Sequence, residues 1–146
     1  MKNIIFLFTK TDFNTPQIDW FNENIFCEDT RIILIFILTE NFYYLSDNKL
    51  LNFSFQINAS ESEKRKFEIK TFLEKVADKF KNKEFLSKII LCGEQKEKLS
   101  FIIKKIGAST IVIGPDLSNK RAFSIFQSLE DYLCKNVEAA VIRVDK

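Results

Sequence analysis

The residues best placed for chemistry follow a short apolar segment in the last third of the chain. Gly114 ends that segment, and the helix expected after it opens with four polar residues, Ser118, Asn119, Lys120 and Arg121. A glycine lets a ligand approach the backbone closely, amide donors at a helix start attract an anion, and lysine and arginine pair with phosphate. The loop is therefore a candidate phosphate site. The alternative, favoured by the single glycine and the lack of a phosphate-loop pattern, is a loop that only caps a helix.

Other catalytic chemistry is restricted by the residue types present. The sequence contains no histidine, which excludes Ser/His and Cys/His nucleophilic pairs, histidine-ligated zinc and a histidine general base. Cys27, Cys92 and Cys134 are odd in number and widely spaced, so they predict neither a disulfide framework nor a CxxC motif and are typical of a reducing cytoplasm. We therefore expect a cytoplasmic protein without catalytic activity.

Length and charge narrow the class of partner. The 146 residues are 46% hydrophobic and 29% charged, which predicts one globular domain over residues 1–146. The net charge is +2 and lysines alternate with glutamates, so nucleic acid is not an expected partner. The longest apolar run, Ile32 to Leu38, is far shorter than the about 20 residues that a membrane-spanning helix needs. No membrane contact is expected.

The elements that would position the Gly114 loop can be identified by their hydrophobic pattern. Four short apolar segments predict strands buried on both faces, and a fifth closes the chain. Segments of helical period lie between them, which indicates an α/β fold with a parallel sheet and crossover helices. The predicted strands are Asn3–Phe8, Arg31–Thr39, Lys88–Cys92, Thr110–Ile113 and Ala139–Val144.

Four helices are expected between these strands, and each has a start or stop signal. Thr15 followed by Pro16 is typical of a helix start, and Ser60 with Glu63 forms a capping box. Gly107 predicts the end of a third helix, and the fourth starts near Ser118. The apolar faces expected to be buried are Ile18, Phe21 and Ile25 in the first helix, Ile69, Phe72, Leu73, Val76 and Phe80 in the second, and Leu99, Ile102, Ile103 and Ile106 in the third, which runs from about Gln95; the fourth has its apolar face within 122–133.

One segment departs from the alternation of strands and helices. Residues 42–58 contain turn-forming residues and then a strict alternation of apolar and polar side chains from Leu51 to Ile57, which predicts a hairpin or a loop inserted before the second helix. Its phenylalanines would form either an exposed edge for a partner or a cover for the flank of the core. The second interpretation is favoured.

The last third of the sequence carries a family resemblance. A strand ending in Cys92-Gly93, a helix over 99–106, the segment Gly107–Gly114 and the closing strand over 140–144 together resemble the universal stress protein family. The resemblance implies a five-stranded parallel sheet in the order 3-2-1-4-5 with helices on both faces, the adenine nucleotide alpha hydrolase-like fold. The N-terminal half matches that family only in its order of elements.

The family's nucleotide motif is incomplete in this chain. Members that bind ATP carry GxxG, nine further residues, and then Gly-Ser or Gly-Thr. Gly114 and Ser128 match this motif, whereas Leu117 and Gln127 stand where glycines are required. Bulk at these positions would hold the backbone amides away from phosphate. The family's acid after the first strand falls at Thr9 or Lys10.

The resemblance implies a nucleotide cleft formed by Thr9, Gly114, Ser118, Asn119, Lys120, Arg121 and Ser128. It further implies a regulatory or stress-response domain that acts as a homodimer and does not bind ATP in the usual way. Family members pair through the last strand, so the expected interface is Val141, Ile142, Arg143 and Val144. An unidentified protein partner is also compatible with this interpretation.

The residues are also compatible with two other functions. A module that binds ATP or AMP, with slow ATPase activity, would use Lys120 and Arg121 for phosphate. A phosphoacceptor domain would need acids after the first and third strands, but Thr9 and Gly93 stand there. The nucleotide-binding module therefore remains the main alternative.

Overall fold

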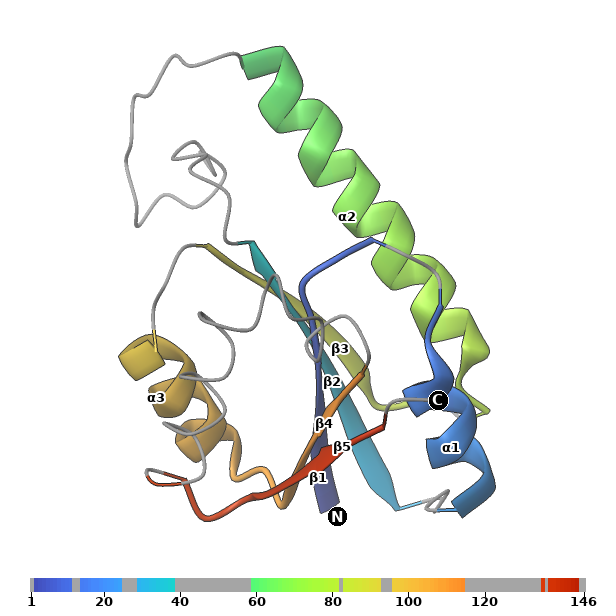
Figure 1. Cartoon of the computed structure of the whole chain (residues 1–146), viewed down its shortest axis with the longest axis vertical. Helices are drawn as coiled ribbons and strands as arrows, with labels where there is room; N and C mark the ends of the chain where they lie inside the picture. Colours follow the sequence, from blue (N-terminus) through green and yellow to red (C-terminus); the bar gives the residue numbers. More distant parts are fainter. Residues whose placement is uncertain are drawn as a thin grey trace.

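The computed structural model describes residues 2–11, 14–24, 29–38, 59–81, 83–92, 96–114, 135 and 137–144. The segment 42–58 and the helix expected after Gly114 lie outside these residues. In the described part of the chain, strands and helices alternate until β4 (Figure 1). The elements are β1 (Lys2–Phe8), α1 (Pro16–Asn24), β2 (Thr30–Leu38), α2 (Ala59–Lys79), β3 (Leu86–Cys92), α3 (Lys96–Ile106), β4 (Thr110–Ile113) and β5 (Ala140–Arg143).

The strands form one parallel sheet in the order β3-β2-β1-β4-β5. The parallel pairing confirms the prediction from the hydrophobic pattern, and the order confirms what the family resemblance implies. Because β1 is central, its side chains alternate between two cores. Ile4, Phe6 and Phe8 pack under α1 and α2, whereas Ile5 and Leu7 pack under α3. Helices therefore cover both faces of the sheet, as predicted.

The edge strand β3 corrects one expectation. It begins at Leu86, two residues before the predicted start at Lys88, and it is not buried on both faces. Ser87 and Lys88 are exposed, and Ile89 and Ile90 are half-buried. An apolar run predicts a strand but not its place in the sheet, and an edge strand has a neighbour on one side only.

Aromatic rings hold α1 and α2 against the sheet. The Phe6 ring makes edge-to-face contacts with Phe21, at 5.3 Å between ring centroids, and with Phe80, at 5.0 Å. Within α2, Phe72 contacts Phe8 and Phe36 at 5.4 and 6.0 Å. Edge-to-face pairs at these distances add to the free energy gained by burial. The apolar face predicted for the second helix is buried as expected.

The start of α1 follows the sequence signals. The helix begins at Pro16, and the Ile18 amide donates to the Thr15 carbonyl at 3.2 Å. The Thr15 hydroxyl also accepts a hydrogen bond from the Lys79 ammonium at 2.7 Å, and the Asn22 side-chain amide donates to the Lys79 carbonyl at 2.8 Å. These contacts join α1 to the end of α2. Residue 25, expected on the buried face, lies outside the described residues.

The other helix ends test two further signals. The capping-box prediction is wrong in its placement, because α2 begins at Ala59 and Ser60 is already helical. Gly107, by contrast, ends α3 with φ of 72°. Its amide donates to the Lys104 carbonyl at 3.1 Å, and the Ala108 amide donates to the Ile103 carbonyl at 3.3 Å. This is a Schellman motif, in which glycine relieves the strain of the left-handed conformation.

Among the helices that the structure describes, none has the length and apolar character needed to cross a membrane.

Candidate functional site

The carboxyl ends of β1 and β4 lie side by side at the switch point of the sheet. Leu7 of β1 pairs with Ile113 of β4, so Thr9 and Gly114 follow neighbouring strand ends. The chain continues from β1 into α1, on the face opposite to α3. A crevice where successive connections leave a parallel sheet in opposite directions is the usual ligand site of such folds.

The side chain of Gln17 packs against Gly114 at this point. Gln17 is the second residue of α1 and is 1% exposed. A Cβ atom added at Gly114 would lie 2.5 Å from the carboxamide carbon of Gln17, which is far inside van der Waals contact. Gly114 therefore provides the close approach that the sequence predicts, but the group that approaches it is a side chain of the same protein.

The Gln17 carboxamide is incompletely satisfied. Its Oε1 atom is buried and accepts no hydrogen bond from the residues that the structure describes. A buried acceptor without a donor costs about 1–3 kcal/mol, and such groups are rare in folded proteins. The position beside Gly114 therefore holds a polar group with an unsatisfied acceptor, whereas the surrounding strands are apolar.

The predicted cleft residues are placed only in part. Thr9 is half-buried after β1, and Gly114 is buried after β4, so the structure brings these two to the same crevice. Lys10 is exposed. The remaining predicted residues lie outside the described part of the chain, and their contribution stays a prediction. They are Ser118, Asn119, Lys120, Arg121 and Ser128, together with the substituted positions Leu117 and Gln127.

Gln17 was not found from the sequence. It directly follows the Thr15-Pro16 helix start, where polar residues are ordinary and carry no signal of a site. Its importance depends on β1 lying next to β4, which brings the start of α1 to the end of β4. Asking which helix start the predicted strand order brings to the end of each strand could have identified Gln17.

Cationic groups lie at the carboxyl edge of β2. The Arg65 guanidinium lies over the Phe36 ring, 5.8 Å from its centroid, and is 3.3 Å from the Glu68 carboxylate. Burial, and then the neighbouring Lys70, lower the pKa of Lys66. In the described residues, no group of three or more acidic or cysteine side chains is arranged to hold a metal ion. This edge of the sheet thus carries an ion pair and a lysine of lowered pKa, both on α2.

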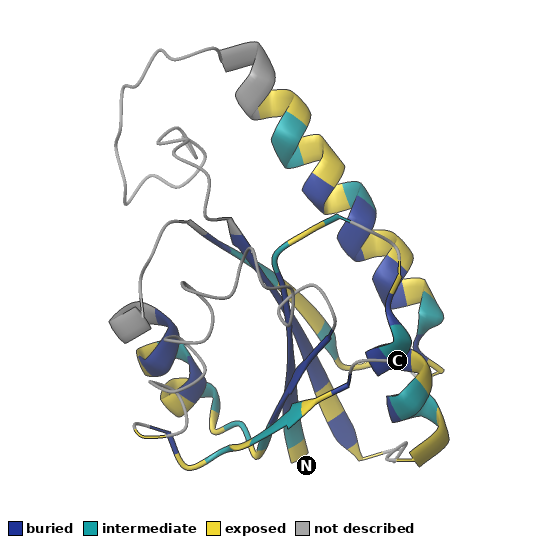
Figure 2. Ribbon diagram, in the orientation of Figure 1, coloured by how far each residue is buried: buried dark blue, intermediate teal, exposed yellow. Residues whose placement is uncertain are grey.

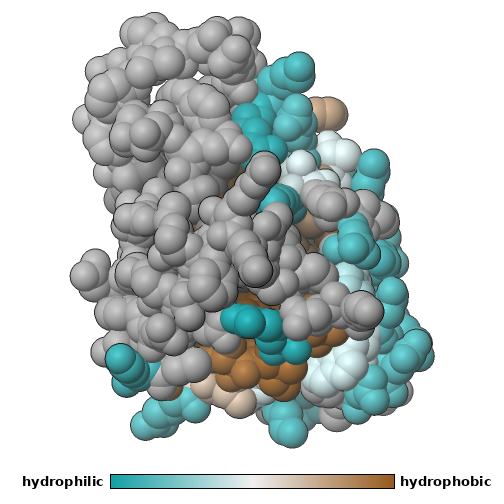
Figure 3. Space-filling model, viewed as in Figure 1, coloured by the Kyte–Doolittle hydropathy of each residue, from teal (hydrophilic) through white to brown (hydrophobic). Residues whose placement is uncertain are grey.

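The predicted interface strand lies at the other edge of the sheet. Among the strands that the structure describes, β5 pairs with β4 alone, and it is short. Val141 and Ile142 are half-buried, Arg143 is exposed and Val144 is buried (Figure 2). Figure 3 shows apolar surface in the lower part of the view, where β5 runs. Val141, Ile142 and Arg143 thus lie together on an edge strand, whereas Val144 follows the strand and is buried in the core.

Comparisons with known proteins identify the fold. No family model and no curated protein matches the sequence. Solved structures do match over nearly the whole chain. A universal stress protein in complex with cAMP has a TM-score of 0.61 at 11% identity, covering 99% of this chain and 96% of its own.

Two further structures are similar. The universal stress protein UspA from Lactobacillus plantarum has a TM-score of 0.61 at 15% identity, covering 98% of this chain and 97% of its own. A universal stress protein family protein from Arabidopsis thaliana with AMP bound has a TM-score of 0.57 at 13% identity, covering 100% and 92%. With the strand order and the helices on both faces, these likenesses show that the chain has the fold of the universal stress proteins.

Proposed function

We propose that this protein is a universal stress protein-like regulatory domain that acts in a stress response as a homodimer and does not bind ATP in the usual way. The shared fold supports the general class. The lack of histidine in the sequence supports a non-catalytic role. The widely spaced cysteines support a cytoplasmic location.

The packing of Gln17 against Gly114 carries this proposal. The first glycine of the family's nucleotide motif serves to leave the backbone open to phosphate. Here the Gln17 side chain occupies the space above that glycine. Thr9 stands where the family's acid is expected, and Leu117 and Gln127 replace the other two glycines. Each substitution removes a different part of a nucleotide site.

Titration calorimetry with ATP and with AMP tests this proposal. We expect neither nucleotide to bind the unmodified protein at millimolar concentration. Gln17→Ala provides the second arm, because it clears the space above Gly114 while leaving Lys120 and Arg121 in place. ATP binding to the unmodified protein would contradict the proposal, whether or not Gln17→Ala changes the affinity.

The alternative is a nucleotide-binding module that uses the loop from Gly114 to Arg121. It is favoured by the structural neighbours that hold cAMP and AMP. In that case ATP or AMP binds the unmodified protein, and a Lys120→Ala/Arg121→Ala double variant weakens the binding, because both cations pair with phosphate. The same calorimetric titrations therefore separate the two functions.

The proposed dimer uses β5 of each copy. An edge strand leaves backbone hydrogen-bonding groups unpaired, and two such edges can pair about a two-fold axis. Support comes from the position of β5 at the edge and from the half-buried Val141 and Ile142. A separate protein partner would use another surface of the domain.

A further inference from the structure

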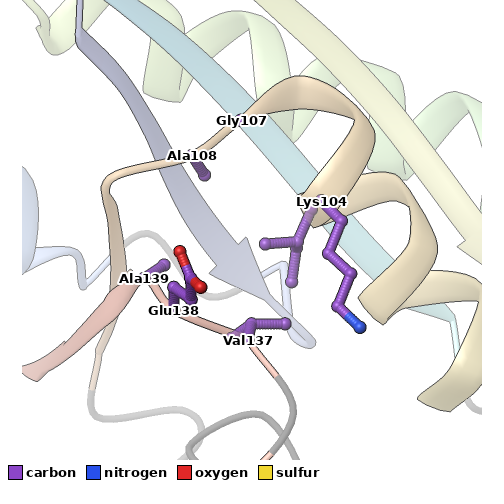
Figure 4. Close-up of a pocket in the computed structure, with 7 residues that line it drawn as sticks. Lys104, Gly107, Ala108, Val137, Glu138 and Ala139 are labelled. Atoms are coloured by element: carbon purple, nitrogen blue, oxygen red, sulfur yellow. The ribbon is translucent and has the colours of Figure 1, made fainter.

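A cavity lies at the end of the sheet opposite to the crevice of Gly114. It occupies about 350 Å³ where the chain leaves α3 and enters β4 and β5 (Figure 4). The side chains of Ile103, Ala108, Val137 and Ala139 form apolar walls. This volume is at the lower end of the range for small-molecule sites in proteins.

Hydrogen bonds fix the rim of this cavity. The Schellman motif at Gly107 ends α3, and the Asn3 side-chain amide donates to the Ile106 carbonyl at 2.7 Å. The Ser109 amide donates to the Asn3 carbonyl at 2.9 Å, and the Ala140 amide donates to the Ser109 carbonyl at 3.1 Å. The rim is thus tied to both β1 and β5, so a ligand would meet a preformed site and little ordering would oppose binding.

The electrostatics of the cavity favour a cation. Glu138 is an exposed residue, and its carboxylate points toward Ala108, into the space between the lining residues (Figure 4). It forms no hydrogen bond or ion pair within the part of the chain that the structure describes. The C-terminus of α3, with its partial negative charge, ends at Gly107 on the same rim. The side chain of Lys104 extends away from Glu138, so its ammonium does not neutralise that carboxylate.

We propose that this cavity binds an aliphatic ammonium ion, with the charged nitrogen at Glu138 and the alkyl chain against Ile103, Ala108 and Val137. A linear amine of six carbons has seven heavy atoms, which at about 30 Å³ each occupy less than the available volume. A carboxylate of the same length would meet like charge from Glu138 and from the helix end. The site is separate from the proposed nucleotide cleft and does not depend on it.

Titrations with three probes of equal chain length test the proposal, and NMR of the backbone amides monitors the binding. We expect n-hexylammonium to bind with shifts centred on Gly107 and Ala108. We expect 1-hexanol to bind about tenfold more weakly, because it lacks the charge that strengthens the hydrogen bond. Hexanoate should produce no saturable shift at these amides.

Two matched variants test whether the Glu138 carboxylate is the group that binds the ammonium ion. Glu138→Gln should weaken n-hexylammonium binding about tenfold and leave 1-hexanol binding unchanged. Glu63→Gln, which removes an exposed acid from α2, should change neither. Equal binding of ammonium and alcohol, hexanoate binding at the same amides, or equal effects of the two variants would each overturn the proposal.

Discussion

The contact between Gln17 and Gly114 links two positions that are far apart in the sequence. A side chain larger than hydrogen at position 114 must displace the Gln17 carboxamide, which is itself enclosed by the protein. The glycine is thus required for packing as well as for any ligand. The orphaned Oε1 atom adds a local cost that the rest of the fold offsets.

This contact predicts a coupling between two substitutions. We expect Gly114→Ala to lower the free energy of unfolding by about 1–3 kcal/mol, because the new methyl group overpacks the crevice. Adding Gln17→Ala should restore part of that loss, since the methyl group then has room. Urea unfolding of the two single variants and the double variant measures the coupling. Strictly additive effects would show that the two side chains are not in contact.

A second prediction concerns the end of α3. Gly107 has a positive φ of 72° and nothing near its Cβ position, so a substitution there is penalised by backbone conformation and not by a clash. Gly107→Ala should cost about 1 kcal/mol. Gly107→Asn should cost less, because asparagine tolerates this conformation better. Equal losses in thermal unfolding would argue against a conformational origin.

At the scale of elements, α2 presents two phenylalanines to opposite environments. Phe72 is 4% exposed and contacts the rings of Phe8 and Phe36, whereas Phe67 is 70% exposed. We expect Phe72→Ala to cost about 3–5 kcal/mol through the cavity it leaves. Phe67→Ala should change stability by less than about 0.5 kcal/mol. Chemical denaturation measures the free energy of unfolding of both variants. Similar losses of stability would mean that the face of α2 carrying Phe72 is not the face packed on the sheet.

Sequence patterns were most informative for elements with a distinctive local signal. The strands were predicted because their apolar runs are short and bounded, and the end of α3 because glycine adopts a positive φ at lower cost than other residues. The start of α2 was predicted too late in the sequence. A capping-box pattern does not by itself fix the first residue of a helix, because the same residues can also lie within its first turn. The exposure of β3 could not be predicted, since it depends on which strand lies at the edge.

Less of the candidate site than of the fold could be predicted from the sequence. Gly114 was identified because it follows a predicted strand, and Thr9 because the acid of the resembled family falls at Thr9 or Lys10. Gln17 was missed because its role arises from tertiary contact alone. A glutamine at the second position of a helix has no local property that distinguishes it from a solvated residue.

At the scale of the whole molecule, the outer edge of β5 predicts the assembly. The amides of Ala140 and Val144 donate to carbonyls of residues 109 and 113 on the β4 side. Because donors alternate along a strand, the Arg143 amide points away from β4. Proline at this position removes an outward donor and leaves the pairing with β4 intact.

We therefore expect Arg143→Pro to convert the proposed dimer to monomer, whereas Arg143→Ala, which keeps the amide, stays dimeric. Sedimentation velocity at tens of micromolar measures both. A monomeric unmodified protein would remove the dimer from the proposed function. A dimeric Arg143→Pro variant would assign the interface to another surface.

The central position of β1 also has a consequence for synthesis on the ribosome. Ile4 pairs with Thr110, more than a hundred residues later in the chain. At roughly 5–20 residues per second, the apolar strand β1 waits about 5–20 s for the partner that closes this side of it. During that interval only the β2 side can be paired, so nascent chains would be exposed to edge-to-edge aggregation. The strand order that creates the crevice thus also leaves β1 half-paired through most of elongation, when this protein would depend most on chaperones.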